Sequence, residues 1–444
     1  MNGDGRPLGV RLDGSYATDP LDDERLGRRL LGLPADWRVP PEPDPRGIED
    51  PKRRPRRGVD PNKLAESGWG LVLPPGAPSR LERALSPLLT LRQEQAGGLV
   101  ERRYRTLIYQ GGSADQFLDD ERAPRGPADP DRVPYYLLLV GGPEVIPFEV
   151  QYDLDQTYAV GRLHFETKDG QPDYQAYERY AEAVVRYERR ARRRTPEAVF
   201  FGAENPEDRA TRRLLQGLLS PLADLIEEKH SRVQVRRRFG QEARKEQLAR
   251  LLGGGETPSL LVASGHGVEV DPGDTRQRSV QGATVCSDWP GPEHPVEPEH
   301  FLAADDVPAD ASLGGSIMLL YSCFSGGTPA EDGYRLPSET RRAIAPRPFV
   351  SALAQRLLGA SQDPALAVIG HVDRTWISLF DWRHETLDDE QTQGHADVFE
   401  SALGAILDGE PVGSGMDWLG QLYADLATRL QSYRDDLDRG EALA

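Results

Sequence analysis

Short apolar runs alternate along most of the chain with longer segments whose apolar residues recur at helical spacing. The runs that predict strands cover 69–73, 135–140, 158–162, 198–202, 233–236, 259–264, 316–321 and 365–370. The segments that predict helices cover 79–91, 174–193, 211–229, 241–252 and 349–358. Nearly continuous apolar strands separated by helices are typical of a mostly parallel sheet with helices on both faces. The pattern therefore predicts an α/β protein.

The two ends of the chain break this alternation. Residues 1–60 are rich in Pro, Arg, Asp and Gly, and such a composition cannot bury much apolar surface. We expect this region to be an extended or partly disordered arm. Helical spacing returns at 399–407 and 418–437, which predicts a helical tail.

Composition narrows the classes of partner. The 444 residues carry a formal net charge of −18, which disfavours nucleic acid and anionic membranes because both bind basic surfaces. No apolar run approaches the roughly 20 residues that span a bilayer, and the first residues lack the pattern of a secretory signal. We expect a cytoplasmic protein that binds neither nucleic acid nor membrane.

Cysteine usage points to chemistry rather than to cross-linking. Cys286 and Cys323 are the two cysteines of the chain, too few for a disulfide framework and without the spacing of a zinc site. We expect neither a metal nor a cofactor. Cys286 lies in a predicted hairpin and is interpreted as structural, so Cys323 is the candidate nucleophile.

Two of the predicted strands end in reactive side chains. The strand at 259–264 leads into His266 and Gly267, and the strand at 316–321 leads into Cys323. Because ligands bind beyond the carboxyl ends of parallel strands, these side chains are expected at one edge of the sheet. A neighbouring imidazole increases the nucleophilicity of a thiol, so we interpret His266 as the base. The backbone N–H groups of Gly267 and Cys323 are the candidates for an oxyanion site.

The paired signatures resemble a known family. An apolar strand followed by His266-Gly267, and another followed by Ser322-Cys323, resemble the caspase-like cysteine peptidases, which include caspases, metacaspases, gingipains, separase and the bacterial CHAT-domain proteins. The segment 136–147 (YLLLVGGPEVIP) is similar to the gingipain-type segment that opens the smaller subdomain. The resemblance implies a cysteine endopeptidase with a His–Cys dyad, acting on a protein or peptide substrate.

The same resemblance implies an architecture. The expected fold is a caspase-like three-layer sandwich with a mostly parallel sheet and two side-by-side subdomains. The regions are an arm at 1–60, an N-terminal α/β extension at 61–129, a smaller gingipain-like subdomain at 130–205, a caspase-like catalytic subdomain at 206–385 and a helical tail at 386–444.

An acidic pocket for the residue before the cleaved bond is also expected from the resemblance. In arginine-specific gingipains an acidic residue lies shortly before the Gly-Arg end of the upstream strand. Asp153 and Asp155 hold that neighbourhood here, before Gly161-Arg162. An acidic pocket pairs with Arg or Lys, so cleavage after a basic residue is expected. The alternative is that both are ordinary turn or cap residues, and Asp373 is the reserve candidate.

The polar, basic segment at 328–348 follows the candidate nucleophile. Corresponding loops are processing or activation sites in several relatives. We expect cleavage here by an activating protease or by the enzyme itself, with Arg335, Arg341 and Arg342 as candidate positions. A plain surface loop is the alternative.

Other functions fit the same residues. A catalytically silent caspase-like scaffold would bind a partner protein, and a cysteine hydrolase of non-peptide substrates would use the same dyad. The intact His266 and Cys323 argue against the scaffold, and His371, after the strand at 365–370, is the rival base. Bacterial relatives act as regulated proteases, some of them zymogens, in immunity or cell death, and the resemblance implies such a role, antiviral defence included.

Overall fold

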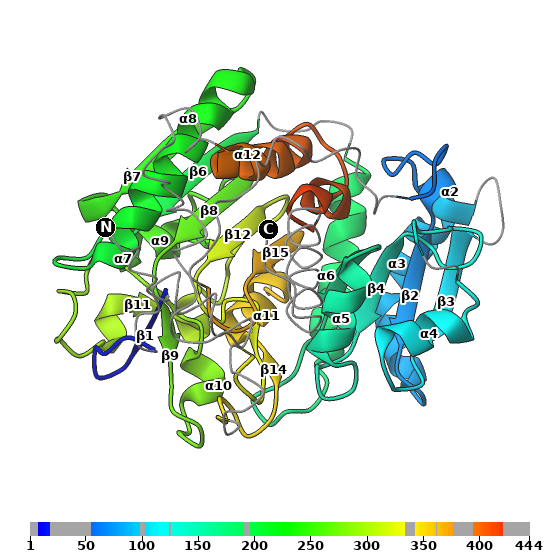
Figure 1. Cartoon of the computed structure of the whole chain (residues 1–444), viewed down its shortest axis with the longest axis horizontal. Helices are drawn as coiled ribbons and strands as arrows, with labels where there is room; N and C mark the ends of the chain where they lie inside the picture. The colour runs from blue at the N-terminus through cyan, green and yellow to red at the C-terminus, as the bar shows by residue number, and fades with distance from the viewer. Residues whose placement is uncertain are drawn as a thin grey trace, which may run out of the picture.

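The computed structural model describes residues 8–17, 55–97, 103–123, 126–190, 196–333, 342–360, 362–375 and 394–420 of the chain. Two parallel sheets lie side by side in this part of the molecule (Figure 1). The predicted α/β class with mostly parallel sheets is confirmed.

The larger sheet carries the strands that end in His266 and Cys323. Its strand order is β15-β12-β8-β6-β7, and every neighbouring pair is parallel. The strands are β6 (Glu197–Gly202), β7 (Gln234–Phe239), β8 (Leu260–Ser264), β12 (Ile317–Tyr321) and β15 (Ala367–Gly370). A central parallel strand is buried on both faces, which is why the runs of β8 and β12 are continuously apolar.

Helices cover both faces of the larger sheet. Successive strand residues point to opposite faces, so Leu261 and Leu320 join one core and Val262 and Leu319 join the other. The first core includes residues of α9 (Lys245–Leu251) and α11 (Ala352–Leu358). The second includes residues of α8 (Ser220–Lys229) and α12 (Gly394–Leu407). A π-helical segment (Leu215–Leu219) joins α7 (Arg209–Leu214) to α8.

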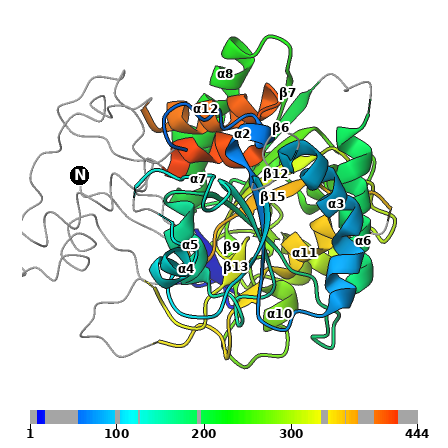
Figure 2. The same cartoon turned by 90° about the vertical axis from the view of Figure 1, so that its right-hand side faces the viewer.

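The smaller sheet has the strand order β3-β2-β4-β5, again with parallel pairs. Its strands are β2 (Trp69–Leu73), β3 (Tyr104–Ile108), β4 (Tyr136–Val140) and β5 (Ala159–Leu163). The helices of this unit are α2 (Leu64–Ser67), α3 (Ser79–Gly97), α4 (Ala114–Asp120), α5 (Phe148–Asp155) and α6 (Tyr174–Glu188). α3 and α6 pack along each other (Figure 2).

A third, short sheet lies beside the larger one, in the order β1-β9-β10-β11. Its strands are β1 (Gly9–Arg11), β9 (Gly267–Glu269), β10 (Thr284–Val285) and β11 (Phe301–Leu302). The elements nearby are α10 (Gln277–Val280) and the antiparallel pair β13 (Gly327–Thr328) and β14 (Phe349–Val350). Figure 1 shows β1 next to β9, although the strands that follow β1 in the sequence belong to the smaller sheet.

The smaller sheet combines strands from two of the predicted regions. The smaller sheet takes β2 and β3 from 61–129 and β4 and β5 from 130–205, while β6 joins the larger sheet. The predicted helix at 349–358 begins as strand β14 before α11. Within the arm at 1–60, residues 8–17 form β1 and a turn, and residues 18–54 lie outside the described residues.

The predicted helix at 399–407 is contained in α12, whereas 421–437 lies outside the described residues. In the described ranges no helix is long and apolar enough to cross a membrane.

Candidate active site

β8 and β12 are neighbouring parallel strands, as the sequence predicts. Ser264, the last residue of β8, pairs with Tyr321, the last residue of β12. Each chain leaves the sheet at this edge and places a reactive residue two positions further on, His266 in one case and Cys323 in the other. Both side chains are fully buried.

The main chains of Gly267 and Cys323 lie directly against each other. A Cβ at position 267 would collide with the carbonyl oxygen of Cys323, so the contact requires glycine. The N–H of Gly267 donates to the carbonyl oxygen of Leu8 at 2.8 Å, and the N–H of Cys323 donates to the same oxygen at 3.4 Å. The two N–H groups predicted for an oxyanion site therefore converge on one oxygen atom.

Asp208 holds the imidazole of His266. Nε2 of His266 lies 2.6 Å from Oδ2 of Asp208, and both side chains are fully buried. A carboxylate only accepts hydrogen bonds, so Nε2 carries the proton and Nδ1 is the basic nitrogen. Nδ1 is buried without a hydrogen-bond partner among the described residues. The rings of Tyr16 and Trp289 pack against the imidazole, with centroids 5.8 and 5.9 Å away.

The surroundings of Asp208 keep its carboxyl group ionised. Asp208 is the N-cap of α7 and accepts the N–H of Ala210 at 3.0 Å and the hydroxyl of Thr211 at 2.8 Å. Tyr16 donates its hydroxyl to Oδ1 at 2.8 Å. Burial by itself raises the pKa of Asp208. Attraction to His266 and these hydrogen bonds lower the pKa by a larger amount, so it lies well below its ordinary value.

Backbone groups enclose the sulfur of Cys323. The N–H of Thr375 donates to Sγ at 3.2 Å. The main chain at Gly9 passes so close that a Cβ there would lie 3.2 Å from the same sulfur. Burial raises the pKa of the Cys323 thiol well above its ordinary value, and the Thr375 N–H offsets this only in part. The thiol is therefore protonated and shielded in this arrangement.

Unusual backbone conformations surround the site. Phe324, directly after Cys323, has a φ of 59°, and Asp373 has a φ of 71°. The N–H of Phe324 donates to the carbonyl oxygen of Asp373 at 2.8 Å, which joins these two residues. Glu207, directly before Asp208, has a φ of 57°. Such conformations cost about 1–3 kcal/mol each for a residue other than glycine and cluster at functional sites.

The acidic residues predicted for a substrate pocket lie in different places. Asp153 and Asp155 are on α5, in the smaller unit, where Asp155 accepts the N–H of Val160 at 3.2 Å. Asp373 lies beside the turn that carries Cys323, and its carboxylate accepts the N–H of Gly333 at 3.2 Å. The structure thus puts Asp373 beside Cys323 and the other two on a separate helix, from which Asp155 lines the same cavity as Asp373. Their roles in substrate binding stay predictions.

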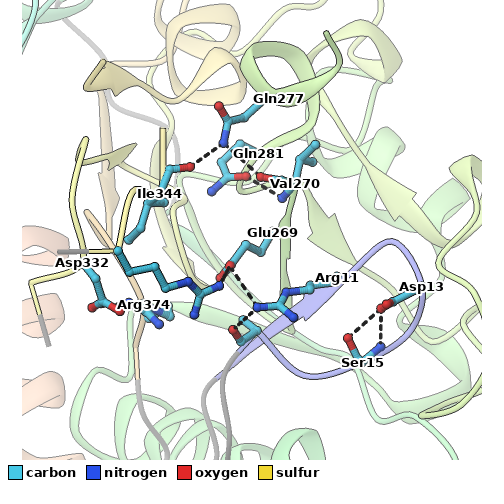
Figure 3. Close-up of polar contacts among 12 residues, drawn as sticks. Arg11, Asp13, Ser15, Glu269, Val270, Gln277, Gln281, Asp332, Ile344 and Arg374 are labelled. Atoms are coloured by element: carbon cyan, nitrogen blue, oxygen red, sulfur yellow. Dashed lines mark hydrogen bonds and ion pairs between the residues drawn. The ribbon is translucent and has the colours of Figure 1, made fainter. Parts of the chain in front are cut away.

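A buried acid that the sequence analysis did not single out lies on β9. Glu269 accepts a hydrogen bond from Arg342 at 3.0 Å and lies 3.9 Å from Arg11. Figure 3 shows Glu269 between Arg11 on one side and Arg374, which pairs with Asp332, on the other. Burial raises the pKa of Glu269, and the three arginines reverse that rise only in part.

The other residues considered in the sequence analysis are His371, Cys286 and the candidate processing positions. His371 packs edge-on against Tyr321 with ring centroids 4.6 Å apart, and burial lowers its pKa to about 4. Cys286 lies in an apolar core of the larger unit, where burial raises its pKa. Two candidate processing positions, Arg335 and Arg341, lie outside the described residues.

Three residues that complete the site were missed by the sequence analysis. Asp208 had a usable signal, because Asp is a preferred N-cap and stands close before the helix predicted from 211, after a strand that ends at the same sheet edge. Leu8 and Tyr16 had none, because they belong to a short segment without periodicity in a region rich in Pro and Gly.

Comparisons with known proteins identify no relative by sequence. No family model matches the chain, and a search of curated proteins finds no similar sequence. Within the described part of the chain, no group of three or more His, Cys, Asp or Glu side chains could hold a metal ion.

Proposed function

We propose that the protein is a cysteine endopeptidase of the caspase-like type, with Cys323 as nucleophile and His266 as base. One observation carries the proposal. The N–H groups of Gly267 and Cys323 converge on a single carbonyl oxygen, that of Leu8. Next to them, Nε2 of His266 is held by the buried carboxylate of Asp208. The neighbouring parallel strands β8 and β12, and the helices on both faces of their sheet, support the three-layer sandwich, with the smaller sheet as the second subdomain.

The first half of the reaction forms a thioester. Nδ1 of His266 takes the thiol proton as Sγ of Cys323 bonds to the carbonyl carbon of the substrate. The carbonyl oxygen gains the negative charge and accepts hydrogen bonds from the N–H groups of Gly267 and Cys323. One such donor is worth about 10²–10³ in rate in a serine peptidase. The imidazolium then protonates the amine nitrogen as the C–N bond breaks, and the amine leaves.

The second half restores the enzyme. His266 takes a proton from a water molecule, the water oxygen bonds to the thioester carbon, and the C–S bond breaks. The acid product leaves, and the proton held by His266 returns to the sulfur of Cys323. In both halves the ionised Asp208 favours the protonated imidazole and fixes its orientation.

Cleavage after Arg or Lys is a separate part of the proposal and rests on the resemblance. A regulated role in bacterial immunity or cell death rests on it as well. Asp373 is joined through its main chain to Phe324, and Glu269 lies on β9, which begins at Gly267. Both are acids to consider beside Asp153 and Asp155 on α5. A peptide panel therefore has to include both basic and apolar residues before the cleaved bond.

The experiment compares three full-length proteins on fluorogenic peptides with Arg, Lys, Asp, Asn or Leu before the scissile bond. We expect cleavage of at least one peptide by the protein in a form whose Cys323 reacts with iodoacetamide, and none by Cys323→Ala. Cys286→Ser is the matched control, because Cys286 is the other buried cysteine and lies in the core. It should retain wild-type turnover.

Two results would contradict the proposal. One is cleavage that persists in Cys323→Ala. The other is the absence of cleavage in a form whose Cys323 reacts readily with iodoacetamide, which would favour a scaffold or a hydrolase of non-peptide substrates. Folding of each variant is checked by circular dichroism.

A further inference from the structure

The segment 8–17 folds back over the proposed active site. β1 pairs parallel to β9, with Gly9 opposite Gly267. The chain then reverses, and the N–H of Ala17 donates to the carbonyl oxygen of Gly9 at 2.9 Å. Asp13 stabilises the turn by accepting the N–H and the hydroxyl of Ser15 at 2.9 and 2.6 Å. The result is a small hairpin fixed on the larger unit (Figure 1).

Both backbone polar groups of Leu8, the carbonyl oxygen and the N–H, form hydrogen bonds. Its carbonyl oxygen accepts the N–H groups of Gly267 and Cys323 at 2.8 and 3.4 Å, and its own N–H donates to the carbonyl oxygen of Thr375 at 2.9 Å. In a cysteine peptidase the carbonyl oxygen of the bond to be cleaved occupies such a pair of N–H donors. Leu8 is therefore held as the residue before the cleaved bond of a substrate would be.

Gly9 brings the chain across the thiol. A Cβ at this position would lie 3.2 Å from Sγ and 3.4 Å from Cβ of Cys323, and 3.0 Å from Cβ of Ala17. These distances are tighter than nine in ten real Cβ contacts, so a Cβ alone needs a shift of a few tenths of an ångström. A β-branched residue adds two more carbons and would push the hairpin away from the sulfur. Glycine at this position is what lets the segment close over Cys323.

Two further side chains fasten the hairpin at the site. Tyr16 packs against the ring of His266 and donates its hydroxyl to Asp208 at 2.8 Å. Arg11 donates to the carbonyl oxygen of Ala17 at 3.1 Å and lies 3.9 Å from Glu269 (Figure 3). The segment therefore contacts the surroundings of both members of the dyad.

We infer that residues 8–17 are a built-in inhibitor that binds as a substrate does, with Leu8 in the place of the residue before the cleaved bond. The inference deepens the proposed function and rests on it for the nature of the site. Leu8 is fully buried in an apolar cluster with Leu214, Tyr321 and Phe324. These apolar surroundings favour Leu at this place over the basic residue that the resemblance implies, so the enzyme with the hairpin displaced should cleave after Leu faster than after Arg.

The test measures how fast iodoacetamide alkylates Cys323 in the folded full-length protein, with the modified peptide identified by mass spectrometry. We expect slow alkylation in wild type and in the control Ser279→Ala, whose side chain is exposed on α10, outside the hairpin. In Gly9→Val alkylation becomes faster by about tenfold or more, the change that a loss of about 1.4 kcal/mol from the covered state produces. Equal rates in wild type and Gly9→Val would overturn the inference.

A second variant tests the same geometry through a covalent link, which can form only while the hairpin lies over the sulfur. The Cβ-to-Cβ separation of 3.4 Å between position 9 and Cys323 is close to that of a disulfide. Gly9→Cys is therefore expected to cross-link to Cys323 in the presence of a mild oxidant such as copper phenanthroline. Dithiothreitol should reverse the link. Ser15→Cys should not form it. Failure of Gly9→Cys to cross-link in a folded protein would overturn the inference.

The readouts separate this inference from the proposed function. Suppose that Gly9→Val is alkylated rapidly but cleaves no peptide. This result would support the covering of Cys323 by the hairpin in wild type and would contradict the peptidase function. Full peptidase activity together with rapid alkylation in wild type would keep the peptidase and overturn the hairpin as inhibitor. A synthetic peptide of residues 8–17, added to Gly9→Val, is expected to inhibit cleavage and to slow alkylation together.

Discussion

At the scale of single residues, Asp208 contacts three different parts of the candidate site. It holds Nε2 of His266, caps α7 and accepts the hydroxyl of Tyr16 from the N-terminal hairpin. One buried carboxylate therefore orients the imidazole of His266, starts a helix and binds the segment 8–17. Loss of its charge should affect stability and catalysis together.

The pH dependence of stability follows from the lowered pKa of Asp208. A carboxyl group with a lower pKa in the folded state stabilises the fold above its unfolded pKa, about 3.9. That contribution is lost as pH falls towards the folded pKa. Asp208→Asn should lower the free energy of unfolding by about 3–5 kcal/mol at pH 7. The difference from wild type should shrink below about pH 4.

Denaturant unfolding between pH 3 and pH 7 measures this difference. The control is Asp224→Asn, which removes an exposed acid that pairs with Arg237 at 2.7 Å and should change stability little at any pH. A stability difference for Asp208→Asn that stays constant over the whole range would contradict the assignment of an ionised, buried Asp208.

At the scale of elements, Ser325 joins the ends of two neighbouring strands. Its hydroxyl lies 2.7 Å from the carbonyl oxygen of Leu320 on β12 and 2.8 Å from that of Ser322. The same hydroxyl accepts the N–H of His371, which follows β15, at 3.0 Å. The turn that carries Cys323 is thus fixed to β12 and to the end of the next strand.

Ser325→Ala should loosen this turn. Leaving the buried partners of the hydroxyl unsatisfied costs about 1–3 kcal/mol of the free energy of unfolding. Because Ser325 acts on the position of Cys323 and does not contact substrate, we expect kcat to fall more than KM changes. Ser279→Ala, which removes an exposed hydroxyl bonded to Arg276 at 3.0 Å, is the control. An unchanged kcat in Ser325→Ala would show that the turn is fixed by other contacts.

At the scale of the whole molecule, α6 of the smaller unit is bound to the larger unit. Tyr180 donates to the carbonyl oxygen of Leu366 at 2.9 Å, and Arg179 donates to that of Gly359 at 3.0 Å. Both acceptors lie between α11 and β15, the last strand of the larger sheet. Unfolding of the two units is therefore expected to be coupled.

The double variant Arg179→Ala with Tyr180→Phe tests this coupling. Removing the two contacts should lower the coupling free energy by about 1–3 kcal/mol. A single calorimetric transition of wild type should then broaden or split. Arg189→Ala is the control, because Arg189 pairs with Glu94 within the smaller unit. A transition of unchanged width in the double variant would contradict the expected coupling.

Much of the fold could be predicted from the sequence because its signals are local. The runs of β8 and β12 are apolar at every position, since both faces of a central parallel strand are buried. Their ends carry His266 and Cys323, and adjacent parallel strands bring such ends together. The alternation of strands and helices determined the α/β class for the same reason.

Other features were decided only by tertiary structure. Asp153 and Asp155 lie on α5, because the segment after Pro147 forms a short helix that the apolar spacing did not indicate. Nothing in a short, aperiodic segment indicates that Leu8 lies against Cys323. That contact joins residues more than three hundred positions apart and depends on hydrogen bonds between main-chain atoms, which every residue type except proline can form. The sequence by itself determined which strands carry the reactive residues, and the tertiary structure decided which segments surround and cover them.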